Sequence, residues 1–196
     1  MEQTNPQPPI GISRAAQIAG DRQFLRDVQQ VLGSTETNLR AALAGLEDGF
    51  QRRRPVPNEW AIVEVLCHLR DLEREVFPIR TALIRKDNRS TLIGFDQEQW
   101  ARERQYASSD SYRALEDFCA ARRSNLELLH QIGDCELECS GLHSEFGALT
   151  LRALLADWAG SDLVHTAQIQ RIRLWRFFPE MGPFQQYFKS ALRLKD

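Results

Sequence analysis

Cysteine is scarce in this 196-residue chain, and none of its four cysteines forms a Cys-x-x-Cys pair. Cys135 and Cys139 are four residues apart, and no second pair completes a zinc site with them. Cys67 and Cys119 fall within helical patterns, where we expect them to be core thiols. This use of cysteine indicates a reducing, cytoplasmic environment.

Charge imbalance and long apolar runs are also missing. The net charge of −2 gives no reason to expect nucleic acid or another polyanion as a partner. No apolar run approaches the roughly 18 residues of a membrane-spanning helix, so no membrane partner is expected. Residues 1–12 lack the apolar core of a signal peptide and are expected to form a flexible tail. Residues 13–196 then predict a single domain with one core.

Sustained alternation of apolar and polar residues is absent, whereas an apolar period of 3.6 recurs in long segments. These segments predict four long helices, over residues 13–46, 60–85, 109–132 and 150–176. Gly33-Ser34 makes the first either two helices or one bent helix, and Pro78 predicts a kink or break in the second. Residues 134–149 are expected to be irregular or at most a short extended pair. The pattern predicts an all-α fold, an antiparallel four-helix bundle with a crossover connection.

Two histidines lie where core residues are expected. His165 shares the apolar stripe of the 150–176 segment with Ser161, and His68 lies on the stripe of the 60–85 segment. A histidine in such a place is either a simply hydrogen-bonded core residue or a metal ligand or catalytic base. If the two helices pack together, the two side chains meet in the interior of the bundle.

These segments resemble a known family. Residues 60–71 follow the order Trp-x-x-x-Glu-Val-Leu-x-His-Leu-x-Asp, and residues 161–169 read Ser-Asp-Leu-Val-His-Thr-Ala-Gln-Ile. With a Phe-x-x-x-Arg segment at residues 118–122, they are similar to the second, fourth and third helices of the DinB/YfiT-like proteins. The resemblance covers residues 35–176. It implies a four-helix bundle, often a homodimer, in which histidines hold a metal ion.

The metal site that this resemblance implies is incomplete. His68 matches the first ligand position and His165 the third, but Ser161 occupies the middle position, where the usual pattern has histidine. A catalytic zinc site normally has three protein ligands plus water, and a serine hydroxyl is a poor ligand beside imidazole. We therefore expect a divalent metal, zinc or nickel, to bind weakly or not at all.

Three carboxylates are candidates to support the ligands rather than to bind the ion. Glu64 and Asp71 each lie about one turn from His68. Asp162 adjoins Ser161, although it points about 100° away around the helix. These three residues are the predicted supporting groups of the site.

The remaining candidates receive simpler interpretations. Ser161 and His165 are one turn apart and have the spacing of a nucleophile pair, but no nucleophile elbow or oxyanion hole accompanies them. We favour Ser161 as a small residue that fills the vacated ligand space. His143 is expected on a solvent-exposed loop, and His130 at the surface near a helix end.

Two classes of function follow. The resemblance brings to mind metal-dependent thiol transferases and isomerases, in which the metal lowers the pKa of a small thiol. The first hypothesis is a diverged protein of that kind, a metal-dependent S-transferase, isomerase or hydrolase, or one that binds a small molecule between its helices. The second is a metal-free, non-catalytic, stress-associated dimeric binding protein. His68 and His165 favour the first, and Ser161 favours the second. A homodimer through helix faces is expected, mainly from the resemblance and also from large apolar residues on more than one helix face.

Overall fold

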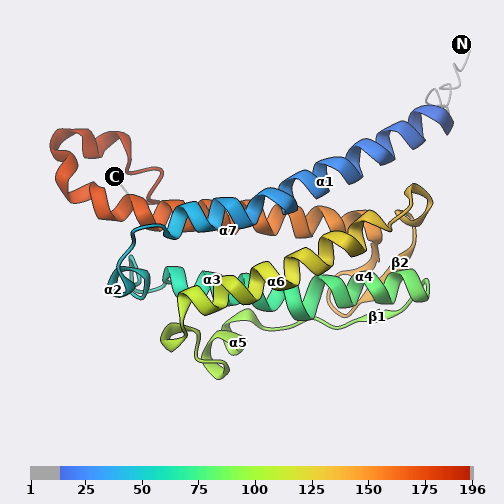
Figure 1. Ribbon diagram of the computed structural model, residues 1–196, viewed down its shortest axis with the longest axis horizontal. Helices are drawn as coiled ribbons and strands as arrows, with labels where there is room; N and C mark the ends of the chain where they lie inside the picture. The colour runs from blue at the N-terminus through green and yellow to red at the C-terminus, as the bar shows by residue number, and fades with distance from the viewer. Residues whose placement is uncertain (1–13, 195–196) are drawn as a thin grey trace, which may run out of the picture.

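Four long helices dominate the structure, a computed structural model that describes residues 14–194 (Figure 1). They are α1 (Arg14–Leu43), the continuous run of α3 (Ile62–Asp71), η1 (Leu72–Val76) and α4 (Phe77–Lys86), then α6 (Ser111–His130) and α7 (Leu151–Phe177). The first predicted segment is a single helix that runs through Gly33-Ser34. The tail predicted over residues 1–12 lies outside the described residues.

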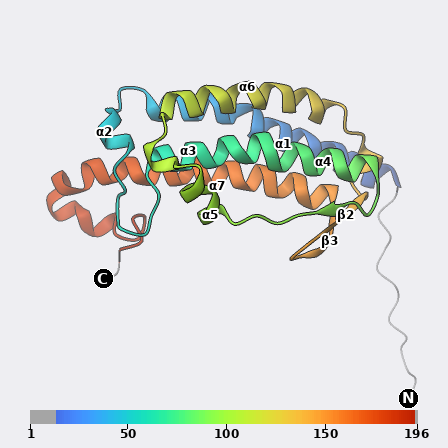
Figure 2. The same ribbon diagram turned by 90° about the horizontal axis from the view of Figure 1, so that it is seen from below.

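Two of the four helices run in each direction along the bundle. In Figure 1, α1 and α7 run from right to left, whereas α3–α4 and α6 run from left to right, and Figure 2 agrees. α1 packs against α6 and α7, and α3 packs against the same two helices. Since α4 and α6 point the same way, residues 87–110 must return along the bundle between them. The predicted four-helix bundle with a crossover connection is confirmed.

The crossover carries a strand that belongs to a small sheet. Its elements are β1 (Thr91–Leu92), α5 (Gln97–Glu103) and η2 (Tyr106–Ser108). β1 pairs in parallel with β2 (Ser140–His143), which forms an antiparallel hairpin with β3 (Gly147–Thr150). Gly141 permits the close approach, because a Cβ there would lie 2.8 Å from the Leu92 side chain. The hairpin is the short extended pair predicted within residues 134–149, and β1 is a strand that the sequence pattern does not predict.

The sheet changes the expected place of one histidine. His143 is only 4 % exposed at the end of β2, and its ring stacks on Phe146 at a centroid distance of 4.8 Å. The prediction of a solvent-exposed loop is wrong, because His143 lies on the buried face of β2, whereas the preceding Leu142, on the opposite face, is 53 % exposed. His130 is exposed near the end of α6, as predicted.

The second long helix contains a π-helical segment. At the end of η1 the N–H of Phe77 donates to the carbonyl of Leu72, five residues back, which widens the turn. Pro78 follows directly and has no N–H to donate. The break that the sequence predicts at this proline is therefore a local change of helix type, and the chain continues as a helix to Lys86.

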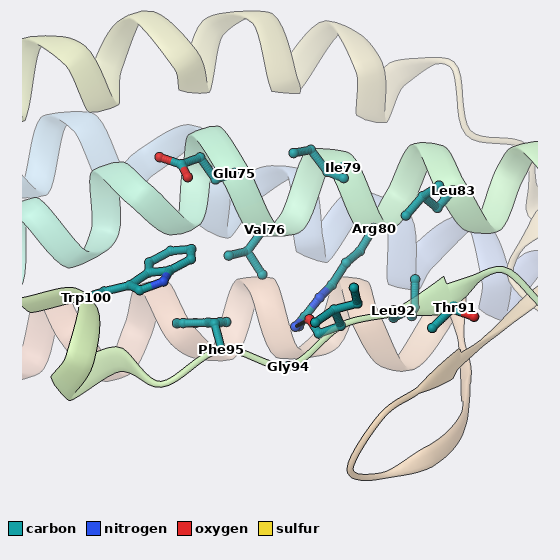
Figure 3. A pocket seen from close by; sticks show the side chains of 11 residues that line it. Glu75, Val76, Ile79, Arg80, Leu83, Thr91, Leu92, Gly94, Phe95 and Trp100 are labelled. Carbon is teal, nitrogen blue, oxygen red and sulfur yellow. Dashed lines mark hydrogen bonds between the residues drawn. The ribbon is translucent and has the colours of Figure 1, made fainter. Parts of the chain in front are cut away.

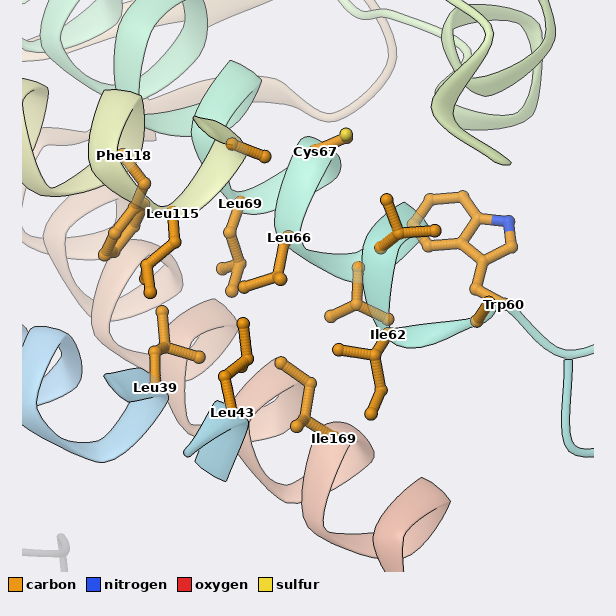
Figure 4. Close-up of a cluster of buried hydrophobic side chains, with 14 of the residues drawn as sticks. Leu39, Leu43, Trp60, Ile62, Leu66, Cys67, Leu69, Leu115, Phe118 and Ile169 are labelled. Carbon is orange, nitrogen blue, oxygen red and sulfur yellow. The ribbon is translucent and has the colours of Figure 1, made fainter. Parts of the chain in front are cut away.

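Apolar side chains from all four long helices fill the interior. Figure 4 shows Leu39 and Leu43 of α1, Leu66 of α3, Phe118 of α6 and Ile169 of α7 in one cluster. Each is at most 1 % exposed. Burial of such a side chain stabilises the fold by roughly 1.5–3 kcal/mol. This core fixes which faces of α3 and α7 look inward.

Three further elements complete the described chain: α2 (Asp48–Gln51), η3 (Asp134–Glu136) and η4 (Phe178–Tyr187). Cys67 and Cys119 are buried free thiols, as predicted. None of the helices in residues 14–194 combines the length and the apolar composition that a membrane span needs.

Candidate functional site

His68 and His165 come together inside the bundle. Their ring centroids are 4.8 Å apart and their planes are inclined at 73°. α3 places His68 in the interior, where it is 3 % exposed, and α7 places His165 half-buried beside it. The meeting predicted from the two apolar stripes is confirmed.

Aromatic rings pack around His68. The ring of Trp60 lies edge-on at 5.0 Å, and that of Phe95 lies at 6.5 Å. The Nδ1 of His68 and the Nε1 of Trp60 are buried without a hydrogen-bond partner among residues 14–194. Leaving such a nitrogen unpaired costs roughly 1–3 kcal/mol. Each of these two atoms could therefore form a hydrogen bond to a ligand.

A pocket of about 220 Å³ opens at His165. Its lining is mainly polar and consists of Asn58, Glu59, Trp60, Gln97, Glu98, His165, Gln168, Arg171 and Arg193. Within it, Arg171 donates to Glu59 at 2.9 Å. The Nδ1 of His165 lies 2.9 Å from the amide oxygen of Gln168. Because that oxygen can only accept, Nδ1 carries the proton and the lone pair of Nε2 stays available.

Burial keeps both imidazoles neutral. Burial, together with the neighbouring His165, lowers the pKa of His68 to about 3, and Asp71 acts in the opposite direction. Burial also lowers the pKa of His165, although the hydrogen bond to Gln168 and the charge of Asp162 both act to raise it. A neutral imidazole can accept a hydrogen bond or bind a metal ion.

The donors present do not complete a metal centre. Within residues 14–194, no group of three His, Cys, Asp or Glu side chains is placed to hold an ion. Ser161 is half-buried on α7, one turn before His165. Two imidazoles and one serine hydroxyl lack the third strong ligand of a catalytic zinc site. The residues therefore do not fit a tightly held divalent ion.

The three predicted supporting carboxylates all have partners other than the two histidines. Glu64 pairs with Arg54 and accepts the N–H of the residue before α3 at 2.8 Å. Asp71 accepts hydrogen bonds from two arginines and, at 2.6 Å, from the hydroxyl of Tyr106. None of the hydrogen bonds of the described residues joins either carboxylate to His68.

Asp162 belongs to a buried ion network at the centre of the bundle. Arg122 of α6 donates to Asp162 at 2.6 Å and to both carboxylate oxygens of Glu73 at 2.7 Å. The hydroxyl of Thr35 in α1 donates to Asp162 at 2.5 Å, and the indole N–H of Trp158 in α7 donates to Glu73 at 2.9 Å. Sequence reasoning missed this network. The available signal was an arginine on the apolar stripe of α6, since arginine is almost never fully buried unless it is paired.

Comparison with known proteins agrees with this architecture. Residues 32–169 match the DinB superfamily. Among solved structures, the chain is similar to YfiT from Bacillus subtilis, described as a probable metal-dependent hydrolase with an unusual four-helix bundle topology. The sequence identity is 18 %, the match covers 87 % of this chain and 93 % of YfiT, and the TM-score of 0.69 shows a shared fold. No curated protein matches the chain. Because the superfamily match spans well over half of the sequence, the chain belongs to the DinB superfamily.

Proposed function

We propose that this protein binds a small molecule where His68 and His165 meet, at a site derived from a metal centre and reduced to two imidazoles. The observation that carries the proposal is the 4.8 Å approach of the two rings beside a polar pocket of about 220 Å³. Two neutral imidazoles supply hydrogen-bond acceptors, and the unpaired indole N–H of Trp60 supplies a donor. No part of the proposal depends on a resident metal ion.

Replacement of Ser161 by histidine tests whether the site is a reduced metal centre. Zinc and nickel are titrated calorimetrically into tag-free protein. We expect weak or no binding by the wild type and tight binding by Ser161→His, because residue 161 and His165 are one turn apart and His68 adds the third nitrogen. Ser161→Ala is the matched control, which changes the residue without adding a ligand and should bind metal as the wild type does.

The other outcomes select between the alternatives. Equal, tight binding by wild type and Ser161→His would show that another residue completes the site. That result would favour a metal-dependent transferase, isomerase or hydrolase, the class to which the description of YfiT also points. No binding by either protein would show that His68 and His165 do not converge on one ion.

The second candidate is a diverged metal-dependent transferase, isomerase or hydrolase, which the description of YfiT favours. The lack of a three-ligand group among the described residues favours a metal-free, non-catalytic binding protein over it. The homodimer that the family resemblance implies and the association with stress, which belongs to the binding-protein hypothesis, remain predictions.

A further inference from the structure

A second pocket, of about 280 Å³, lies between α4 and the crossover (Figure 3). Its walls are mostly apolar: Val76 at the end of η1, Ile79 and Leu83 of α4, and Leu92, Phe95 and Trp100 of the crossover. At the rim, Ile79 is 50 % exposed. A concave, largely apolar surface with a few polar groups is the usual form of a small-molecule site.

Arg80 supplies the cation of this pocket. Figure 3 shows its side chain extending from α4 toward the crossover near Gly94. One guanidinium nitrogen donates to the carbonyl of Ile93 at 2.7 Å, and the group lies 5.8 Å from the centroid of the Phe95 ring. Within residues 14–194, its other N–H groups have no hydrogen-bond partner and it takes part in no ion pair. Burial lowers its pKa, as expected for a partly desolvated cation.

The acidic groups near Arg80 do not neutralise it by direct contact. Glu75 also lines the pocket, but Arg104 holds its two carboxylate oxygens at 2.8 and 3.0 Å. Asp157 and Glu145 form no hydrogen bond with Arg80. Their charges act at a distance to raise its pKa, but the lowering by burial is larger. The pocket therefore combines apolar walls with one guanidinium that forms no ion pair with a carboxylate of residues 14–194.

We propose that this pocket binds a small monocarboxylic acid with a hydrophobic body, whose carboxylate pairs with Arg80. The planar guanidinium matches a carboxylate in a two-pronged hydrogen bond. A single cation suits a single negative charge better than a multiply charged phosphate. The apolar walls suit an aliphatic or aryl body. The volume equals that of roughly nine water molecules at about 30 Å³ each, which fits an acid of about ten heavy atoms.

The acid pocket adjoins the histidine site through Phe95. This residue lines the acid pocket, stacks on Trp100 at 4.5 Å and lies 6.5 Å from the ring of His68. Arg80 nevertheless lines the acid pocket and not the pocket at His165. The inference goes beyond the function proposed above and requires neither a metal ion nor an imidazole.

Octanoate is the probe for this site, and octan-1-ol is its neutral analogue of equal length. In calorimetric titrations at neutral pH, we expect one saturable site for octanoate. Arg80→Gln should weaken octanoate binding about tenfold or more, as for the loss of a hydrogen bond between charged groups, and leave octan-1-ol unchanged. Arg74→Gln is the matched control. Arg74 is an exposed arginine of η1 outside the pocket, and its replacement should preserve the affinity for octanoate.

A substitution at the rim tests the charge effect without disturbing the interior. Ile79→Glu places a carboxylate beside the proposed ligand and should weaken octanoate binding more than the neutral Ile79→Gln does. This pair carries the test if circular dichroism shows that Arg80→Gln does not fold. The proposal is overturned if the wild type shows no saturable site for octanoate, or if octanoate and octan-1-ol bind equally. It is also overturned if Arg80→Gln and Ile79→Glu both bind octanoate with the wild-type affinity. None of these results bears on the zinc titration of Ser161→His.

Discussion

At the scale of single residues, the surroundings of His68 determine its chemistry. Trp60 and Phe95 pack around the ring, and His165 adds a second group that would carry the same charge. A protonated imidazole there would lose its hydration, and none of the carboxylates of the described chain hydrogen-bonds to it. The neutral base is consequently the stable form over the whole physiological range of pH.

The low pKa of His68 predicts acid-sensitive stability in metal-free protein kept in EDTA. The pKa is about 3 in the folded state and about 6.5 in the unfolded chain. Between these values only the unfolded chain takes up the proton, so acid favours unfolding. The contribution of His68 is complete above pH 6.5 and is lost as the pH falls, at up to about 1.4 kcal/mol per pH unit.

Urea unfolding at pH 7, 6 and 5 measures this slope. His68→Gln removes the titrating group. The slope of the unfolding free energy against pH should then decrease by up to about 1.4 kcal/mol per pH unit, the equivalent of one proton. An unchanged slope in this variant would contradict the low pKa of His68.

Sequence spacing reveals which face a polar residue occupies, but not which partner reaches it from another helix. His68 and His165 could be predicted as neighbours because each interrupts an apolar stripe on a helix expected to pack inward. The partners of Glu64 and Asp162 could not be predicted in this way. Their ion pairs depend on how Arg54 and Arg122 are placed by separate segments of the chain.

At the scale of the elements, the long helices are predictable because each repeats one apolar face over many turns. β1 has only two residues and therefore shows no alternation, and it pairs with β2, far along the chain. The π-helical η1 leaves the apolar pattern nearly intact, so only Pro78 signals a change there. Local periodicity cannot predict an element that depends on pairing with a strand far along the chain, or one that differs from an α-helix by a single hydrogen bond.

The start of α3 gives a test at this scale. Glu64→Ala removes the acceptor for the buried N–H of Ala61 and breaks the pair with Arg54. We expect the free energy of unfolding, measured in urea, to fall by about 1–3 kcal/mol, the usual cost of an unsatisfied buried donor. Glu64→Gln keeps an acceptor oxygen and should cost less.

A metal titration separates this structural role from support of the histidines. In the Ser161→His background, Glu64→Ala should leave zinc affinity unchanged. A loss of zinc affinity without a loss of stability would instead assign Glu64 to the site, as its spacing from His68 originally suggests.

At the scale of the whole molecule, one buried network joins all four long helices. Arg122 of α6 contacts the carbonyl of Leu32 in α1, Glu73 in η1 and Asp162 in α7. Asn125 of α6 donates to the Glu73 carboxylate at 2.9 Å as well. Buried ion pairs often add little net stability, but losing one partner is costly. The network therefore favours one arrangement of the helices over others that would bury similar apolar area.

Arg122→Met tests this arrangement most directly. It keeps an apolar side chain of similar length but leaves Glu73 and Asp162 buried without their cation, so the free energy of unfolding should fall by about 3–5 kcal/mol. Arg123→Met is the matched control, because the neighbouring side chain is 62 % exposed and its replacement should change stability by less than about 0.5 kcal/mol. Adding Glu73→Met and Asp162→Leu to Arg122→Met should recover much of the loss, since no unpaired charge then remains in the interior. If Arg122→Met unfolds in urea at the same concentration as Arg123→Met, the network does not hold the four helices together.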